Sequence, residues 1–74
     1  MVKIFKVKHL TPKKILDQVQ RSGIINYMYS WHYTIDEKRN TISFNLRFTG
    51  GNDQEKEKEM MRELETFIKS IDME

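Results

Sequence analysis

The stretch from Tyr27 to Thr49, YMYSWHYTIDEKRNTISFNLRFT, decides the fold. Large apolar residues occupy every second position on both sides of the polar segment 36–40, and a period of two is typical of β-strands. Asn40 readily adopts the left-handed conformation that a hairpin loop requires. If Ile35 lies opposite Ile42, every large apolar side chain falls on one face, so the register is strongly specified. The other predicted pairs are then Tyr33–Phe44, Trp31–Leu46 and Tyr29–Phe48.

The segment before the hairpin predicts a strand followed by a helix. Val2–His9 is rich in β-branched and aromatic residues and indicates a strand. Thr11 is a good N-cap, and Pro12 suits the first helical position because its missing N–H is not needed there. The predicted helix ends near Ser22, where Gly23 provides the stop.

The segment after the hairpin predicts a second helix. Asn52, with Glu55 three residues later, resembles a capping box. Apolar residues then recur at helical spacing as far as Ile71. The first turns of this helix are acidic, which suits the positive end of the helix dipole.

The order β-α-β-β-α predicts a two-layer α+β sandwich formed by a single domain over residues 1–74. We expect a three-stranded sheet with strand 1 beside strand 3 and parallel to it, strand 2 on the far side, and both helices on one face. This is the layout of a ferredoxin-like domain without its last strand. On strand 1, Phe5 and Val7 are expected to point to the core.

The aromatic residues of the second strand allow two interpretations. Aromatic side chains alternating along a strand could form a platform on which RNA bases stack. Alternatively they form the core, because the opposite face would force polar groups against the helices at about 1–3 kcal/mol each. We favour the core for all four side chains: Tyr27, Tyr29, Trp31 and Tyr33.

Composition excludes several classes of protein. The chain has no cysteine, so disulfide frameworks, cysteine-based zinc sites and thiol nucleophiles are excluded. It has no apolar run near the ~18–20 residues of a membrane span and no signal-peptide pattern, so we expect a soluble cytoplasmic protein without membrane association. Neither His9 nor His32 has a carboxylate at a suitable spacing, and no phosphate-binding loop or nucleophile motif occurs. We therefore expect no enzymatic activity, no metal site and no cofactor.

The uncovered face of the sheet is the predicted working surface. It is expected to be polar and mildly basic, with apolar positions at Ile4 and Met28, and to border an unpaired edge on strand 1. A regulatory protein-interaction module, an adaptor or an inhibitor, would dock its unknown protein partner at this face or edge, and two copies pairing there would form a homodimer. The predicted partner-binding residues are Lys6, Lys8, His32, Asn45 and Arg47.

Nucleic acid is the second predicted partner. The net charge of +2 divides into +5 over residues 1–40 (eight Lys and Arg against three Asp and Glu) and −3 over residues 41–74 (five against eight). A basic patch is typical of a protein that binds phosphate backbones. The residues expected to contact phosphates are Lys6, Lys8, Lys13, Lys14 and Arg47.

The layout also resembles the small regulatory domains of the ACT type. The matching stretches are Lys3–Lys8, Thr11–Ser22, the hairpin Tyr27–Phe48 and Asp53–Ile71. Two features differ, because the turn before the first helix has no glycine and the last strand is missing. The resemblance implies a third function, a sensor of a small ligand, without pointing to particular site residues.

Overall fold

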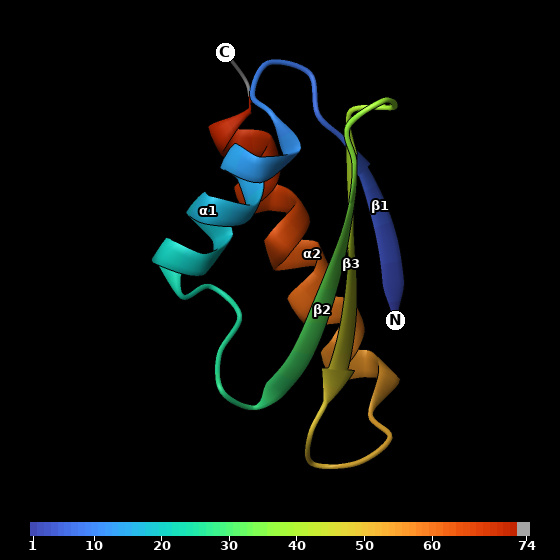
Figure 1. Cartoon of the computed structure of the whole chain (residues 1–74). Helices are drawn as coiled ribbons and strands as arrows, with labels where there is room; N and C mark the ends of the chain where they lie inside the picture. Colours follow the sequence, from blue (N-terminus) through green and yellow to red (C-terminus); the bar gives the residue numbers. More distant parts are fainter. Residues whose placement is uncertain (73–74) are drawn as a thin grey trace.

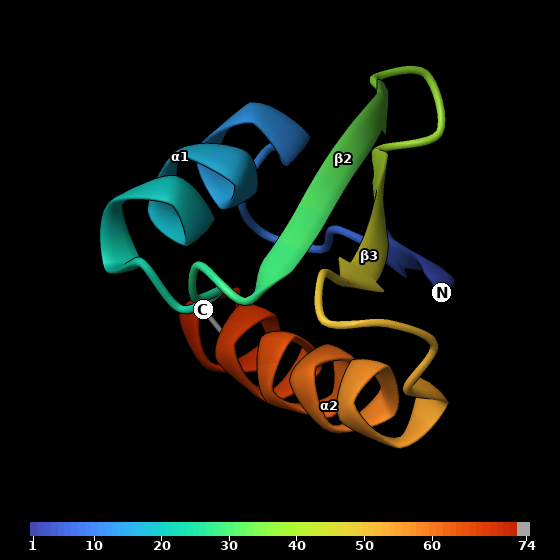
Figure 2. The same ribbon diagram turned by 90° about the horizontal axis from the view of Figure 1, so that it is seen from below.

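The computed structural model describes residues 1–72 and contains five elements in the predicted order. They are β1 (Val2–Lys6), α1 (Pro12–Ser22), β2 (Tyr29–Asp36), β3 (Thr41–Phe48) and α2 (Gln54–Ile71). The strands form one sheet in the order β1-β3-β2, and both helices cover the same face of it (Figures 1 and 2). The predicted α+β sandwich, a three-stranded sheet with both helices on one face, is confirmed, and residues 1–72 contain no fourth strand.

The central strand β3 runs antiparallel to both of its neighbours. The order of the strands is as predicted, but the prediction that strand 1 is parallel to strand 3 is wrong. The helical crossover gives β1 and β2 the same direction, and the hairpin then reverses the chain into β3. A strand that lies between the other two must therefore oppose both.

The hairpin has the predicted register. Ile35 lies opposite Ile42, and the remaining aromatic and aliphatic pairs follow as expected. Asn40 has a φ of 55°, so the predicted left-handed residue is confirmed. The alternation of large apolar residues was sufficient to fix this register, because a slip of one residue would move all of them to the solvent.

The helix ends agree with the sequence pattern at three of four predicted positions. Thr11 caps α1 by accepting the Lys14 N–H at 3.2 Å, and Gly23 ends the helix with a φ of 64°. α2 ends at Ile71, as predicted. Its N-cap is Asp53, which accepts the Lys56 N–H at 3.2 Å, so the prediction of Asn52 is wrong by one residue. Both residue types cap well, and the charged Asp53 carboxylate interacts better with the helix dipole.

The core lies between the sheet and the two helices. Phe5 and Val7 of the first strand segment are buried there, as predicted. Phe44 on β3 contacts the rings of Phe5 and Trp31, with centroid separations of 6.0 and 5.8 Å. The largest fully buried side chains are Phe44, Ile15, Ile42, Leu46, Leu64 and Val19.

Two of the four tyrosine and tryptophan side chains predicted for the core are exposed. Tyr27 lies before β2 in a turn, which Asn26 closes by accepting the Met28 N–H at 2.9 Å, and its side chain is 93% exposed. Tyr33 is on the helix-covered face but is 48% exposed, because β2 is an outer strand with no neighbouring strand on its far side. Tyr29 and Trp31 are half-buried against the core.

Candidate functional site

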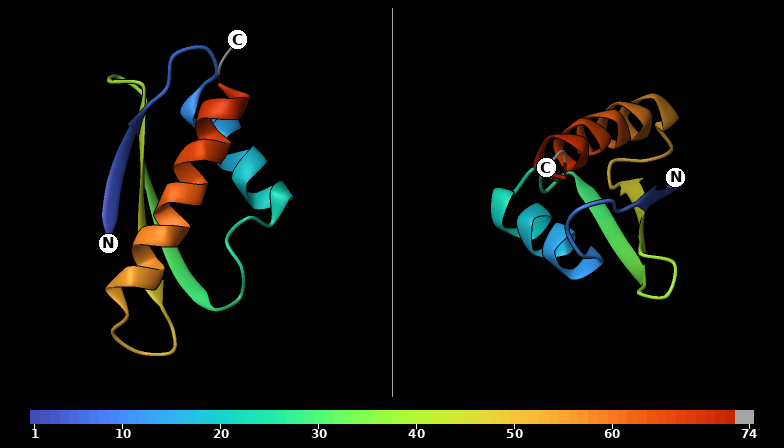
Figure 3. Two further views of the ribbon diagram at one scale, coloured as in Figure 1. Left: turned by 180° about the vertical axis from the view of Figure 1, so that it is seen from behind. Right: turned by 90° about the horizontal axis from the view of Figure 1, so that it is seen from above.

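The outer side of β1 is an unpaired strand edge. β3 bonds one side of β1, and no residue among 1–72 pairs with the other (Figure 3). The Leu46 N–H donates to the Met1 carbonyl at 2.7 Å, and the Val7 N–H donates to the Asn40 carbonyl at 2.9 Å. Odd-numbered positions therefore bond to β3. The alternation of an antiparallel ladder turns the N–H and C=O groups of Val2, Ile4 and Lys6 toward the free side.

A groove, the edge groove, separates this edge from α2. It consists of two concavities of about 550 and 360 Å³ between β1 and α2. Glu65 borders both, and its carboxylate binds the Lys3 ammonium at 2.9 Å where they meet. The hydrogen bond from Lys3 lowers the pKa of Glu65 below its ordinary value. Buried apolar side chains line the groove as well: Phe5, Met61 and Ile68.

One side of α2 presents a row of basic residues to the edge groove. Together with Glu65, three basic residues border the two concavities: Lys58, Arg62 and Lys69. Successive members of this row are three or four residues apart, so all four lie on one helix face. The acidic Glu59 and Glu63 border a larger concavity of about 610 Å³, which Arg62 borders as well and which none of the predicted site residues borders.

Asp72, directly after α2, holds the chain where it leaves β1. Its carboxylate accepts the backbone N–H groups of Lys8, His9 and Leu10 at 2.7, 2.9 and 2.7 Å. Burial favours the protonated carboxyl, but the three N–H donors outweigh burial and lower the pKa of Asp72. This contact turns the chain away from the sheet, which is why β1 ends at Lys6 and not at the predicted His9.

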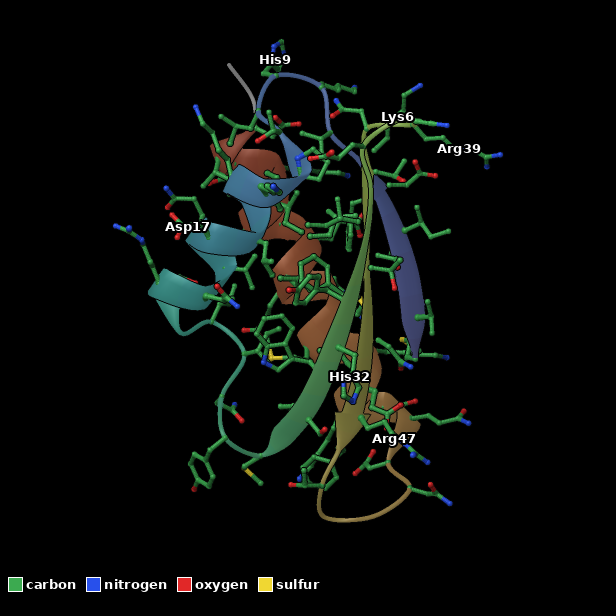
Figure 4. All side chains as sticks on the ribbon, in the orientation of Figure 1. Lys6, His9, Asp17, His32, Arg39 and Arg47 are labelled. Carbon is green, nitrogen blue, oxygen red and sulfur yellow. The ribbon has the colours of Figure 1, made fainter. Side chains whose placement is uncertain are left out.

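The structure divides the predicted partner-binding residues into two groups. Lys6 and Lys8 lie at one end of the sheet and border the edge groove. His32 and Asn45 are opposite each other in the register of β2 and β3, on the open face. Arg47 lies farther along β3, so it and His32 are distant from Lys6 (Figure 4). All five side chains are exposed, but they do not form one cluster.

The residues predicted to bind phosphates are divided in the same way. Lys13 and Lys14 form the first turn of α1, which begins at the end of the sheet where β1 ends (Figure 1). They are exposed, as are Lys6 and Lys8. Arg47 borders a separate concavity with Ser30 and Glu57 at the other end of the molecule. Four of the five predicted phosphate-binding residues therefore belong to one end.

The most informative residues for the candidate site were not predicted. The sequence analysis missed three basic residues because the helix that contains them is acidic as a whole: Lys58, Arg62 and Lys69. Their spacing of four and seven residues places them on one helix face and could have indicated them. His9 and His32 lie far apart (Figure 4), and among residues 1–72 no three His, Asp or Glu side chains are grouped to hold a metal ion. No helix within that range is both long and apolar enough to cross a bilayer. Comparisons with models of known families, with curated proteins and with solved structures gave no match to the chain.

Proposed function

We propose that the chain is a small, non-enzymatic protein-interaction module, an adaptor or an inhibitor, which binds its partner at the free edge of β1 and the adjoining open face. The observation that supports this proposal is the unpaired edge itself. Three residues of β1 turn both backbone hydrogen-bonding groups away from the sheet, and two of them, Val2 and Ile4, have side chains that are 62% and 67% exposed. A strand edge of this kind is a template for the backbone of another chain.

A protein partner would make both backbone hydrogen bonds and apolar contacts at this edge. Its backbone would hydrogen-bond to Val2, Ile4 and Lys6, and its apolar side chains would cover Val2 and Ile4 on the open face. Lys6 and Lys8 flank the contact and would pair with acidic groups. His32, Asn45 and Arg47 would be reached only by a partner that extends across the open face.

A photo-crosslinking amino acid in place of Val2, in cells that naturally express the chain, tests this function. We expect a discrete protein adduct, which disappears when Ile4→Pro is added to the same chain. Proline removes the outward N–H of Ile4 without disturbing the bonds between β1 and β3. Tyr33→Pro, which removes an outward N–H from the other outer strand, is the matched control and should leave the adduct intact. No adduct at Val2, or one unaffected by Ile4→Pro, would contradict the proposal.

Nucleic-acid binding is a second candidate, which one observation favours. Lys6, Lys8, Lys13 and Lys14 form no ion pair with any residue among 1–72, so their charges are available to phosphates. Four phosphate contacts would weaken binding roughly a hundredfold between 50 and 200 mM salt. Fluorescence anisotropy with labelled single- and double-stranded DNA and RNA measures this, and Lys13→Glu should weaken binding further. The absence of binding at low salt would exclude this function.

The homodimer and the small-ligand sensor stay predictions.

A further inference from the structure

The edge groove is far more basic than the chain as a whole. The cations that border its two concavities are Lys3, Lys6, Lys8, Lys58, Arg62 and Lys69. Only two carboxylates border it, and both have partners: Glu65 pairs with Lys3 and Lys69, and Asp72 accepts three backbone N–H groups. Six side-chain cations against two carboxylates give the lining side chains a balance of +4, compared with +2 for the entire chain. Arg62 also borders the concavity of Glu59 and Glu63, and the Met1 ammonium, which borders the groove too, pairs with Glu57.

The groove lies where a fourth strand would fit. On one side the backbone of β1 offers hydrogen bonds at Val2, Ile4 and Lys6, and on the other side α2 provides a wall. Successive side chains of an added strand would point alternately to the open face and into the groove. Those on the open face would meet Val2 and Ile4, and those in the groove would meet the cations of α2.

We infer that the partner presents an acidic, extended segment, which adds to the sheet as a fourth strand along β1 and places its carboxylates in the edge groove. This inference rests on the proposed function and specifies the chemistry of the partner. An acidic strand fits the edge groove best, because its carboxylates would offset the excess positive charge of the side chains that line the groove. β-branched or other apolar residues at the alternate positions of the segment would cover Val2 and Ile4.

A second copy of the chain fits this edge less well. If two copies paired β1 to β1 about Ile4, the backbone hydrogen bonds could form, with Val2 of one copy opposite Lys6 of the other. The two rows of α2 cations would then face the same narrow space. Like charges brought together in this way oppose association. The charges that would attract an acidic strand therefore act against self-pairing.

The test uses two end-capped, fluorescein-labelled peptides of eight residues and the full chain. One peptide alternates Glu with Val, and the other alternates Lys with Val. Fluorescence anisotropy should show saturable binding of the Glu peptide, weaker at higher salt, and at least tenfold weaker binding of the Lys peptide. Equal affinity for the two peptides would overturn the inference, as would a β1-dependent dimer, seen as a sedimentation mass near twice 9.0 kDa that Ile4→Pro abolishes.

Two matched surface variants locate the binding. Lys69 and Arg21 are both exposed helix cations with a carboxylate partner four residues away, but only Lys69 borders the edge groove. Lys69→Glu should weaken binding of the Glu peptide roughly tenfold, because it replaces an attraction by a repulsion, and Arg21→Glu less than about twofold. Equal effects of the two would overturn the assignment of the groove. Circular dichroism confirms that each variant is folded.

The two experiments separate the inference from the proposed function. If the Val2 crosslink forms and depends on Ile4 but the Glu peptide does not bind, the edge binds a protein and the acidic chemistry is wrong. If neither the crosslink nor peptide binding is observed, the interaction function at this edge fails as well. Binding of the Glu peptide that Lys69→Glu weakens and Tyr33→Pro does not affect supports both.

Discussion

The two outer strands of the sheet turn their backbones to solvent in different surroundings. On β2 the Thr49 N–H donates to the Met28 carbonyl at 2.9 Å, so even-numbered residues bond to β3 and the odd-numbered ones face outward. Those outward positions have the largest side chains of the strand, and Trp31 lies beside Phe44 and Tyr33 with ring separations of 5.8 and 6.4 Å. On β1 the outward positions are Val2, Ile4 and Lys6, and the edge groove lies beside them.

This difference sets the charge of each edge. β2 has no lysine or arginine, and the side chains of Tyr29, Trp31 and Ile35 at its outward positions pack against the core. Charged side chains protect β1, and lysine on an edge strand repels other basic strands but attracts acidic ones. Of the two edges, β1 is therefore the one that selects its partner by charge.

The largest expected effect comes from the residue that supports both edges. Phe44 is fully buried and contacts Phe5 of β1 and Trp31 of β2. Phe44→Ala should lower the free energy of unfolding by about 3–5 kcal/mol, because a large cavity opens in a small core. Urea unfolding followed by circular dichroism measures this loss. Thr34→Ala on the open face is the control, expected within about 0.5 kcal/mol of the parent chain. A loss below about 1 kcal/mol for Phe44→Ala would contradict a shared core.

An intermediate effect is expected from acid, which should destabilise the contacts of β1 and leave β2 largely unaffected. Asp72 has a pKa below its ordinary value of 3.8, and Glu57 and Glu65 have pKa values below 4.5. Carboxyls with lowered pKa values contribute stability above their unfolded pKa, and this contribution is lost as the pH falls through the folded values. We therefore expect stability to decline as the pH falls below about 4.5. The protection of the Lys8–Leu10 amides against hydrogen exchange should then fall more than that of the Thr34 and Asp36 amides, which bond to β3.

Asp72→Asn tests whether this carboxylate is the cause. The amide has one acceptor oxygen in place of two, so at least one N–H of the turn loses its partner at a cost of about 1–3 kcal/mol at neutral pH. The variant should also lose the acid-induced fall in the protection of the Lys8–Leu10 amides, which hydrogen exchange measured by NMR would detect. An acid-induced fall that persists unchanged in Asp72→Asn would assign the effect to another group.

The smallest expected effect concerns the ion pair between β1 and α2. The Lys3 and Glu65 side chains are partly exposed, so Lys3→Met should cost less than about 1 kcal/mol. Arg21→Met breaks a more exposed ion pair on α1 and should cost less still. Urea unfolding of both variants compares them. A loss above about 2 kcal/mol for Lys3→Met would show that the pair, and not the buried apolar groups, holds β1 to α2.

The hairpin and the helices could be predicted because each depends on a local pattern, and the order of the strands followed from the simplest way to connect them. Thr11 with Pro12, Gly23 and Asn40 are local signals of the same kind, and all three were predicted correctly. The direction of β1 relative to β3 was wrong because it follows from combining two connections in three dimensions. Asp72 was missed because its partners are 62 to 64 residues away. An acidic residue at the negative end of a helix dipole is locally unfavourable, and that mismatch was the available signal.

The sequence by itself determined which faces of the strands and helices are apolar, because periodicity is a property of the chain alone. It could not determine how far the core extends. Tyr33 has the same alternation as Phe44, yet one is half exposed and the other fully buried, because only the central strand has neighbours on both sides. The tertiary structure also decided which charges meet. The cations of β1 and α2 are distant in sequence, and the net charge of only +2 gives no sign of them. The fold brings them to a single groove beside the free edge of β1, where an acidic strand could pair.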